Sequence, residues 1–463
     1  MAEQNTSNKL HIAMHPWVAT GHMTPFLYLS NELAKRGHKI TFFVPHKAQL
    51  HLQKLNHFPQ LITFQNVKIP HVEGLPLGTE TASEIPISIN YLLVRAVEKT
   101  RDQVEEALGA IKPDIVLYDT AHWLPAVARK FGIKTVCYNV VCAASLAIAL
   151  VPARNIPKDR AITVEELSEP PPGYPSTKLV LRGHEAKTLL FLSMPWVEGM
   201  TFYESITTAM KESDAIAIRT SRELEGNLCD YMSTQYQKSV LLSGPVLPKE
   251  SDHNEKLEEP LCNWLDGFGQ GSVVFCAFGS QLMLEKKQFQ ELLLGFEATG
   301  LPFLVALKAP EGCESIEEAL PEGFEERVKG RGVVSRGWVQ QSLILNHSSV
   351  GCFVNHCGFG SMWESLMSKK QIVLVPHLGD QLLNTKLLVE ELEVAVEAKK
   401  DENDWVSKES LREAIKLVMD KDSEVGDRVK KNHEKWLEIL SKPGLMDGYI
   451  DNFVQSLKDL RNA

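Results

Sequence analysis

At residues 350–366 the chain reads VGCFVNHCGFGSMWESL, and this stretch decides the fold. The apolar run Val350–Val354 predicts a buried strand, and apolar residues at helical spacing from Ser361 onward predict a helix. Gly358 and Gly360 lie between them and allow a tight turn. Such a turn points backbone N–H groups at an anion, and the helix dipole favours negative charge there. The stretch therefore predicts an anion-binding strand–turn–helix unit in an α/β protein.

Side chains near this turn have the chemistry to hold what the anion is attached to. Trp338 could stack on a flat base, Glu364 could accept from ribose hydroxyls, and Asp380 with Gln381 could bind a sugar. Each has a simpler interpretation alone, because a lone Trp is more often core and a Glu in a first helical turn often only complements the dipole. It is their order along the chain that predicts a nucleotide-sugar site.

The same residues resemble the donor-binding box of plant family 1 UDP-glycosyltransferases, and the likeness extends along nearly the whole chain. In that family a Trp stacks on uracil, a Gln and a Glu hold the ribose, a His and a Ser hold the diphosphate, and an Asp-Gln pair contacts the sugar. The resemblance implies, in that order, Trp338, Gln341, Glu364, His356, Ser361, Asp380 and Gln381. The expected donor site is completed by Ser280, Val339, Gly358 and Gly360.

The departures from the family pattern point to a branch. Most members have Trp-Asn where this chain has Phe359-Gly360, so a contact to the donor phosphate or sugar is missing or replaced. The form His-Cys-Gly-Phe-Gly-Ser, with residues 170–176 and 181–186, resembles the branch that adds a sugar to a sugar already on a flavonoid. This implies a flavonoid or anthocyanidin 3-O-glycoside as acceptor. A terpenoid glycoside or a bare aglycone stays an alternative, and the donated sugar (glucose, xylose or rhamnose) stays open.

Polar residues at predicted strand ends suggest the catalytic groups, because ligands of parallel sheets collect beyond the carboxyl ends of the strands. His22 follows the first strand, and Asp119 ends another. A neutral His can take a proton from an acceptor hydroxyl, and a carboxylate on its other nitrogen fixes the tautomer. The resemblance implies that His22 is the base and Asp119 its partner, with inversion and no covalent intermediate. Alone, His22 could be a turn residue and Asp119 a helix cap, and His15 and His122 compete as bases.

The sequence predicts no cofactor beyond the UDP-sugar co-substrate, and no metal. The only DxD string, Asp420-Lys-Asp422, lies in a charged, helix-like run and predicts a solvated helix face. Phosphate charge would then be met by Ser280, His356, Ser361 and a helix N-terminus. Two other function classes fit the sequence less well. An NAD-dependent dehydrogenase needs a third Gly that the run Gly358–Trp363 lacks, and a non-catalytic nucleotide-sugar binder would have lost its base or orienting carboxylate.

The acceptor side is less defined. Residues 170–203 mix Pro, Gly and aromatic residues, as segments that line pockets often do, although a surface excursion packed on its own domain is an equal alternative. The expected acceptor-binding residues are Trp17, Trp123, Asn139, Phe191 and Trp196.

Composition narrows the class further. The 463 residues are 44% hydrophobic and 23% charged, which predicts an ordinary globular protein of two domains. A net charge of −10 without a long basic cluster argues against a nucleic-acid partner.

No apolar run is long enough for membrane insertion and the start lacks a signal pattern, so we expect a cytoplasmic protein. Scattered cysteines without a CxxC pair predict buried thiols instead of a zinc site. We expect a monomer, although no pattern fixes the oligomeric state.

Strand and helix patterns alternate twice along the chain, which predicts two doubly wound parallel sheets. The first set of predicted strands is 10–14, 40–44, 62–64, 115–118, 135–138, 215–218 and 240–242. The second set is 273–277, 303–307, 333–335, 352–354, 372–375 and 395–398. We therefore expect a GT-B fold, with two Rossmann-like domains facing an interdomain cleft. The expected divisions are an acceptor domain 1–247, a linker 248–260, a donor domain 261–445, and a final helix 446–463 that, by resemblance, packs back on the first domain.

Overall fold

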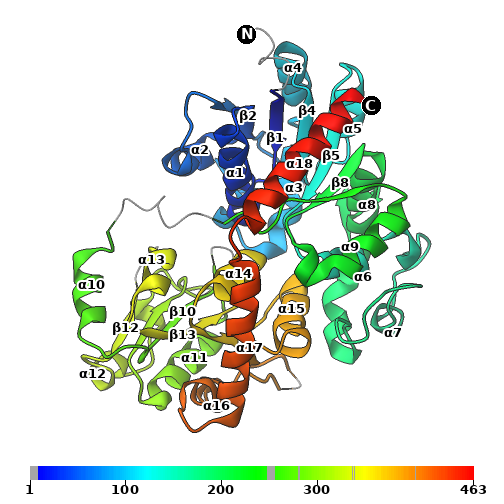
Figure 1. Cartoon of the computed structure of the whole chain (residues 1–463). Coiled ribbons are helices and arrows are strands. Elements are labelled where there is room, and N and C mark those ends of the chain that lie inside the picture. Colours follow the sequence, from blue (N-terminus) through cyan, green and yellow to red (C-terminus); the bar gives the residue numbers. More distant parts are fainter. Residues whose placement is uncertain (1–8, 248–255, 280–281, 336, 338, 402) are drawn as a thin grey trace. The chain divides into compact units, whose positions relative to one another are not determined.

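The computed structural model describes residues 9–247, 256–279, 282–335, 337, 339–401 and 403–463 (Figure 1). Contacts divide the chain into two units, one of residues 1–247 with 443–463 and the other of residues 248–442. The predicted boundary after residue 247 coincides with the first division. The second division falls at 442/443, a few residues before the expected 445/446, because the last helix begins directly after Pro443-Gly444.

Seven parallel strands form the sheet of the first unit, in the order β3-β2-β1-β4-β5-β8-β9. They are β1 (His11–His15), β2 (Lys39–Val44), β3 (Ile62–Asn66), β4 (Ile115–Tyr118), β5 (Lys134–Asn139), β8 (Ala215–Ile218) and β9 (Val240–Leu242). The chain winds outward in one direction from β1 and in the other from β4. The topological switch point of this sheet therefore lies between β1 and β4, where doubly wound folds bind ligands.

Helices cover this sheet, and the strands β2, β1, β4, β5 and β8 are buried because both of its faces are packed. The helices are α1 (Thr20–Lys35), α2 (His46–Leu52), α3 (Asn90–Glu98), α4 (Arg101–Ile111), α5 (Leu124–Arg129), α6 (Ala143–Ala149), α7 (Val164–Ser168), α8 (Phe202–Glu212), α9 (Arg222–Tyr236) and α18 (Leu445–Asn462). A 3-10 segment (Gly183–Ser193) and a short antiparallel hairpin of β6 (Pro195–Val197) and β7 (Met200–Thr201) complete the unit. The hairpin was not predicted.

The C-terminal helix α18 packs on the first unit, beside α1 and β9 (Figure 1, red). Its apolar face, with Phe453 and Leu457 fully buried, joins the core that contains α1 and the sheet. The Arg36 guanidinium donates to Asp451 at 2.6 Å and to Asp447 at 3.2 Å. Apolar burial and this ion pair together fix the last helix on the unit in which the chain begins.

The second unit has six parallel strands in the order β12-β11-β10-β13-β14-β15. They are β10 (Val273–Ala277), β11 (Phe303–Ala306), β12 (Gly332–Val334), β13 (Val350–Asn355), β14 (Gln371–Leu374) and β15 (Val396–Glu397). The helices are α10 (Glu259–Asp266), α11 (Lys286–Thr299), α12 (Phe324–Arg327), α13 (Gln341–Asn346), α14 (Phe359–Met367), α15 (Gly379–Lys386), α16 (Lys408–Met419) and α17 (Glu424–Leu440), with a π-helical turn at Leu387–Glu391. The switch point lies between β10 and β13.

Every strand of both large sheets was predicted from the sequence, and the two doubly wound units confirm the expected fold class. Helix α10 begins at Glu259, inside the stretch expected to be a linker. In the described part of the chain, no helix is long and apolar enough to cross a membrane.

Candidate active site

His22 and Asp119 meet at the switch point of the first unit. His22 lies in the first turn of α1, which follows β1, and Asp119 comes directly after β4. The His22 Nδ1 lies 2.6 Å from the Asp119 Oδ2. The other carboxylate oxygen accepts from the Trp17 backbone N–H at 2.7 Å. Asp119 is therefore committed to holding the histidine and the loop before α1, and it does not cap a helix.

Burial strengthens this pair. The Asp119 side chain is 4% exposed and that of His22 is 28% exposed, so the carboxylate is shielded while the imidazole reaches solvent. An ionised Asp119 can only accept, so His22 carries its proton on Nδ1 and keeps a lone pair on Nε2. This is the tautomer that a general base needs. The interpretation of His22 as a turn residue bonded to its own loop is wrong, because its ring bonds to Asp119.

The two competing histidines make other contacts. His15, at the end of β1, is buried with its ring 5.7 Å from the Trp123 ring and 6.0 Å from the Phe43 ring. The His122 Nδ1 lies 3.8 Å from the Glu98 Oε1. Burial lowers the pKa of both histidines. Their environments favour neutral rings in packed surroundings, and His22 alone among these three pairs with Asp119.

Glu98 is a residue that the sequence did not suggest. It ends α3, and its Oε1 accepts from the Trp123 indole N–H at 3.1 Å. Burial raises the pKa of Glu98 to about 7. Through Trp123 and His15 this carboxyl joins the contacts around the end of β1. No local signal could have found it, because a Glu at the end of an amphipathic helix is ordinary.

The expected acceptor residues do not form one group. Trp17 is buried in a cluster with α3 residues, and half-buried Trp196 packs against the same cluster. Phe191 and Trp196 both pack edge-on against Phe202, with ring centroids 4.8 and 4.9 Å away. Trp123 is buried beside His15. Thus four of the five are aromatic residues in linked contacts around α3 and the β6–β7 hairpin.

Asn139 has a different environment. It is buried at the end of β5, and its Nδ2 donates to the backbone oxygens of Cys137 at 3.2 Å and Ala217 at 3.3 Å. These bonds hold the amide nitrogen within the sheet. The nitrogen of Asn139 therefore has a structural role, and its contact with an acceptor stays a prediction.

In the second unit the turn after β13 has the predicted strand–turn–helix form. Asn355 is fully buried, accepts from the Cys357 backbone N–H at 2.9 Å and donates to Ser365 at 3.1 Å. The Asn384 side chain donates to the Cys357 carbonyl at 2.8 Å. These bonds hold Cys357 at a φ of 56°, in the left-handed region. The resulting turn directs the chain into α14.

Two glycines make room for the His356 ring. A Cβ on Gly358 would lie 2.6 Å from the His356 Nε2, and one on Gly279 would lie 3.0 Å from its Cε1. Helix α14 begins at Phe359, with Gly358 as N-cap, so Gly360 and Ser361 lie in its first turn. The backbone N–H groups of a first turn have no partner inside the helix. Gly360 is exposed, and a Cβ there would meet no heavy atom within 4 Å.

His356 is a neutral histidine at this turn. Burial lowers its pKa to about 4, and its Nδ1 is buried with no hydrogen-bond partner among the described residues. Burial, reinforced by Lys400 and His356, likewise lowers the pKa of His377 to about 3, and its Nε2 also has no such partner. Buried polar atoms without partners are costly. Their presence beside a helix N-terminus indicates a place that binds a polar group.

The remaining donor residues come from three helices. Gln341 begins α13, and its Nε2 donates to the Glu364 carboxylate in α14. Asp380 lies in the first turn of α15. The Gln381 Oε1 accepts from the backbone N–H groups of His377 at 2.9 Å and Leu378 at 3.1 Å. The oxygen of Gln381 therefore holds the turn before α15.

Three further residues were predicted for the donor site: Val339, Ser280 and Trp338. Val339 packs against an apolar cluster of the second unit, and its backbone oxygen accepts from Gln341 N–H at 2.8 Å. Ser280 and Trp338 lie outside the described residues.

The Asp420-Lys-Asp422 string lies in the turn between α16 and α17, where Asp420 accepts from the Asp422 N–H at 3.0 Å. It was expected on a helix face, and it is a surface turn because α16 ends at Met419.

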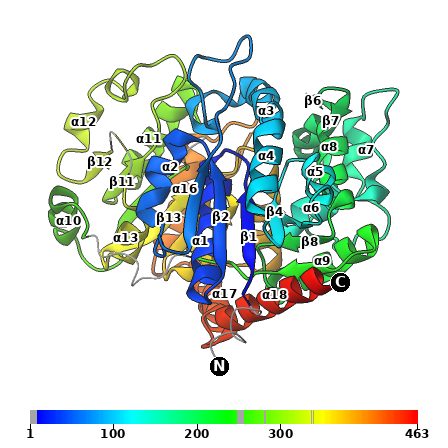
Figure 2. The same cartoon turned by 90° about the horizontal axis from the view of Figure 1, so that it is seen from above.

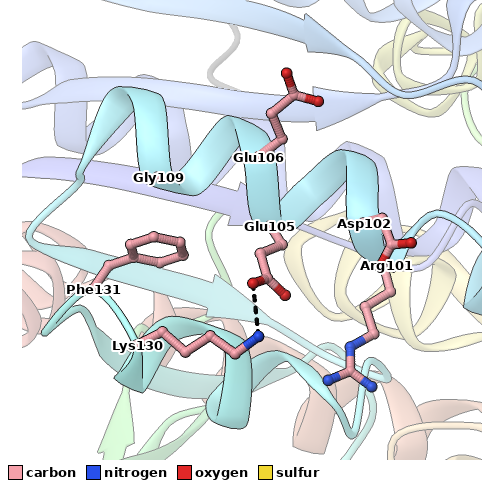
Figure 3. A pocket seen from close by; sticks show the side chains of 7 residues that line it. All are labelled: Arg101, Asp102, Glu105, Glu106, Gly109, Lys130 and Phe131. Atoms are coloured by element: carbon pink, nitrogen blue, oxygen red, sulfur yellow. Dashed lines mark hydrogen bonds and ion pairs between the residues drawn. The ribbon is translucent and has the colours of Figure 1, made fainter.

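A depression on the first unit has none of the residues described above in its lining (Figure 3). It is lined by α4 and the end of α5, and a Lys130–Glu105 ion pair of 2.6 Å crosses it. The lining residues are Arg101, Asp102, Glu105, Glu106, Gly109, Lys130 and Phe131. None was predicted as a site residue.

The chain was compared with known proteins. Residues 252–432 match the family model of UDP-glucoronosyl and UDP-glucosyl transferase. UDP-glycosyltransferase 79B2 of Arabidopsis thaliana is 57% identical, over 98% of this chain and 97% of that protein. The anthocyanidin 3-O-glucoside 2'''-O-xylosyltransferase of the same plant is 54% identical, over 98% of each chain. Among solved structures, Arabidopsis thaliana UGT89C1 has a TM-score of 0.75 at 24% identity, with 97% of this chain and 99% of that chain covered.

The two doubly wound units have the fold of the solved UGT89C1 structure, and the named relatives show that the chain is a glycosyltransferase of the GT-B fold. The long matches at more than half identity go further, and the chain belongs to the plant family 1 UDP-glycosyltransferases.

Proposed function

We propose that this enzyme transfers a sugar from a UDP-sugar to a hydroxyl on the sugar of a flavonoid or anthocyanidin 3-O-glycoside, with inversion and without a metal. The acceptor class is supported by the 54% identical relative, whose name describes xylosyl transfer to an anthocyanidin 3-O-glucoside. The hydrogen bond between His22 and buried Asp119 carries the catalytic part of the proposal. We keep a cytoplasmic location and a monomeric state as predictions of the sequence.

In the proposed reaction, His22 is the general base. Its Nε2 takes the proton of the acceptor hydroxyl while the hydroxyl oxygen bonds to the anomeric carbon. The bond from that carbon to the UDP oxygen breaks, and its electron pair leaves with the diphosphate. Asp119 stabilises the imidazolium that forms, because its carboxylate lies 2.6 Å from Nδ1. One displacement at the anomeric carbon inverts its configuration.

The second unit would hold the donor. His356, which is neutral at pH 7, would donate a hydrogen bond to the diphosphate together with Ser361 and the N–H groups of the first α14 turn. Gln341 and Glu364 already hydrogen-bond each other, so they are positioned as a pair for the ribose hydroxyls. Asp380 and the amide nitrogen of Gln381 would meet the sugar. These groups are the basis for proposing that no metal is required, with Ser280 and Trp338 added by resemblance.

A donor-by-acceptor screen read by mass spectrometry tests this proposal. UDP-glucose, UDP-xylose and UDP-rhamnose would each be offered with a flavonol, its 3-O-glucoside and a terpenoid glucoside. We expect added mass only on the flavonol glucoside, and the increment identifies the sugar. Transfer only to the aglycone or the terpenoid would overturn the acceptor class, and no transfer from any donor would overturn the function itself. Full activity after EDTA dialysis is expected, and a loss that Mg²⁺ restores would contradict metal independence.

A further inference from the structure

A cluster of three different metal-ligating side chains lies in the second unit, away from the turn of residues 356–358 that follows β13 and is called the donor turn below. Cys262 and Asp266 are one helical turn apart on α10, so they share a face. His347 directly follows α13. One ligand atom from each of these residues, the Cys262 Sγ, an Asp266 carboxylate oxygen and a His347 ring nitrogen, lies within 4.8 Å of the other two. Figures 1 and 2 both show α10 beside α13.

Two distances between ligand atoms, each to a different oxygen of Asp266, are close to those around a tetrahedral zinc ion. The Cys262 Sγ lies 3.8 Å from the Asp266 Oδ2, and the His347 Nε2 lies 3.3 Å from the Asp266 Oδ1. Around tetrahedral zinc, with bonds of about 2.3 Å to sulfur and about 2.0–2.2 Å to nitrogen and oxygen, ligand atoms are about 3.6 Å (S to O) and about 3.4 Å (N to O) apart. A carboxylate can bind through either oxygen, and Asp266 is exposed and therefore able to turn.

The histidine is held by a second residue, as zinc-binding histidines commonly are. The His347 Nδ1 lies 2.9 Å from the Ser349 hydroxyl, and Ser349 is 1% exposed. The Ser349 backbone N–H also lies 3.3 Å from the same nitrogen. The hydroxyl can donate to Nδ1 while Nε2–H faces Asp266, and it can accept from Nδ1–H when Nε2 binds a metal. In the structure Nδ1 is the acceptor of the Ser349 backbone N–H, so the ring proton is on Nε2. Metal binding at Nε2 moves that proton to Nδ1, where the Ser349 hydroxyl accepts it and the longer backbone bond is lost.

The scaffold beneath the three side chains is packed. Leu265 of α10 and Ile344 of α13 are fully buried in one apolar cluster with the start of β13. The ligand-bearing helix and the turn after α13 are thus fixed to each other by apolar contacts. A preformed arrangement of this kind reduces the entropy lost when an ion binds.

We propose that Cys262, Asp266 and His347 bind Zn²⁺, with water as the fourth ligand, and that the ion clamps α10 to the turn before β13. The site precedes β13 and the donor turn follows it, so the two lie at opposite ends of that strand. The ion is therefore a structural clamp of the second unit and takes no part in sugar transfer. Binding releases the thiol proton of Cys262 to solvent, because the thiolate is the ligand.

Cobalt substitution tests the site directly. The full-length protein, treated with chelator and reductant, would be titrated with Co²⁺ and followed by absorption. We expect a thiolate-to-cobalt charge-transfer band and visible bands of tetrahedral Co²⁺ that saturate at one ion per chain and are displaced by Zn²⁺. Cys262→Ala should lose the charge-transfer band and His347→Ala should bind at least ~10-fold more weakly. Cys313→Ala, which removes another half-buried cysteine of the same unit, should behave as wild type.

A band that survives in Cys262→Ala, or no band in the wild-type protein, would overturn the proposal. A second measurement is independent of spectroscopy. Zn²⁺ should raise the midpoint of thermal unfolding of the wild type and of Cys313→Ala but not of His347→Ala, because an ion that binds only the folded state stabilises it. An equal rise in all three proteins would contradict the site. The rate of sugar transfer should be the same with and without Zn²⁺.

Discussion

The switch points of the two sheets differ in how their polar groups are satisfied. In the first unit, both oxygens of Asp119 are bonded, one to His22 and one to the Trp17 N–H. In the second unit, His356 and His377 bury ring nitrogens that have no hydrogen-bond partner among the described residues. The His22–Asp119 pair thus has its partners within the protein, whereas the ring nitrogens of His356 and His377 have none among the described residues. This difference separates a preassembled base from a binding turn.

Changes in the two units should affect different quantities, the rate of the chemical step in the first unit and the donor affinity in the second. A change at the His22–Asp119 pair should lower the rate of the chemical step and leave donor affinity unchanged. A change at the turn before α14 should act first on donor affinity. Variants that reverse this division would show that the two sites do not have separate roles.

The largest effect is expected for His22→Ala. Without the base, the acceptor hydroxyl keeps its proton, so we expect kcat to fall about 10³-fold or more. The Kd for UDP, measured by calorimetry, should stay within about twofold of the wild type. His46→Ala, at an exposed histidine of the same unit, serves as the control and should retain full activity. Substantial turnover by His22→Ala would sink the assignment of the base.

A smaller but still large loss is expected for Asp119. Asp119→Ala removes the bond to Nδ1 and the bond to the Trp17 N–H, so tautomer and loop are both released. We expect kcat to fall about 10²–10³-fold, no more than in His22→Ala, with UDP affinity unchanged. Asp119→Asn keeps an acceptor for Trp17 and separates the two causes. If Asn restored the wild-type rate, the carboxylate charge would have no role in stabilising the imidazolium.

The comparison also shows how far sequence reasoning could go. Strands buried on both faces are nearly continuous apolar runs, so the central strands of the two large sheets were predictable, and the less buried edge strands β3, β9, β12 and β15 still contain short apolar runs. The β6–β7 hairpin was not, because strands of three and two residues carry no periodicity. Within the sites, the order of residues predicted the turn after β13. The pairing of His22 with Asp119 came from the resemblance, and local sequence left three histidines in competition.

Residues that act through distant partners were invisible in the sequence. Burial in the folded protein raises the pKa of Glu98, while the hydrogen bond from Trp123 acts in the opposite direction. Cys262 and Asp266 share a helix face, but His347 reaches them only because α10 and α13 pack together. No local spacing encodes such contacts. The sequence therefore predicted elements and motif residues better than it predicted the electrostatic environment of any one group.

Gly360→Asn tests the donor turn by adding a side chain instead of removing one. Gly360 is exposed in the first turn of α14, and an added side chain meets nothing within 4 Å. Asn there should leave the fold intact, with a gain in unfolding free energy of about 0.3 kcal/mol. If the position faces the donor, KM for at least one UDP-sugar should change about 3- to 10-fold, with a smaller change in kcat. Unchanged kinetics with every donor would place Gly360 outside the donor site.

Burial raises the pKa of Glu98 in the first unit and lowers the pKa of His356 in the second. The effects of these two groups on stability are the smallest that we predict. The pKa of Glu98 is raised from 4.5 to about 7, so the folded state holds this proton more tightly than the unfolded state. Its contribution to the unfolding free energy therefore falls as pH rises from about 4.5 to 7. The pKa of His356 is lowered from 6.5 to about 4, so its contribution is present above pH 6.5 and is lost as pH falls toward 4.

Neutral replacements should expose the two slopes. The midpoint of thermal unfolding of Glu98→Gln minus that of the wild type should be larger at pH 7.5 than at pH 4.5. The reason is that Gln removes a carboxylate whose ionisation is costly in the folded state. His356→Asn should show the reverse, with its relative midpoint higher at pH 4.5 than at pH 7.5. Using differences from wild type cancels the titration of other buried groups, including His38 and His377. Slopes of the same sign for both variants would mean that burial does not set the charge of these groups, and the contrast between the two units would lose its electrostatic basis.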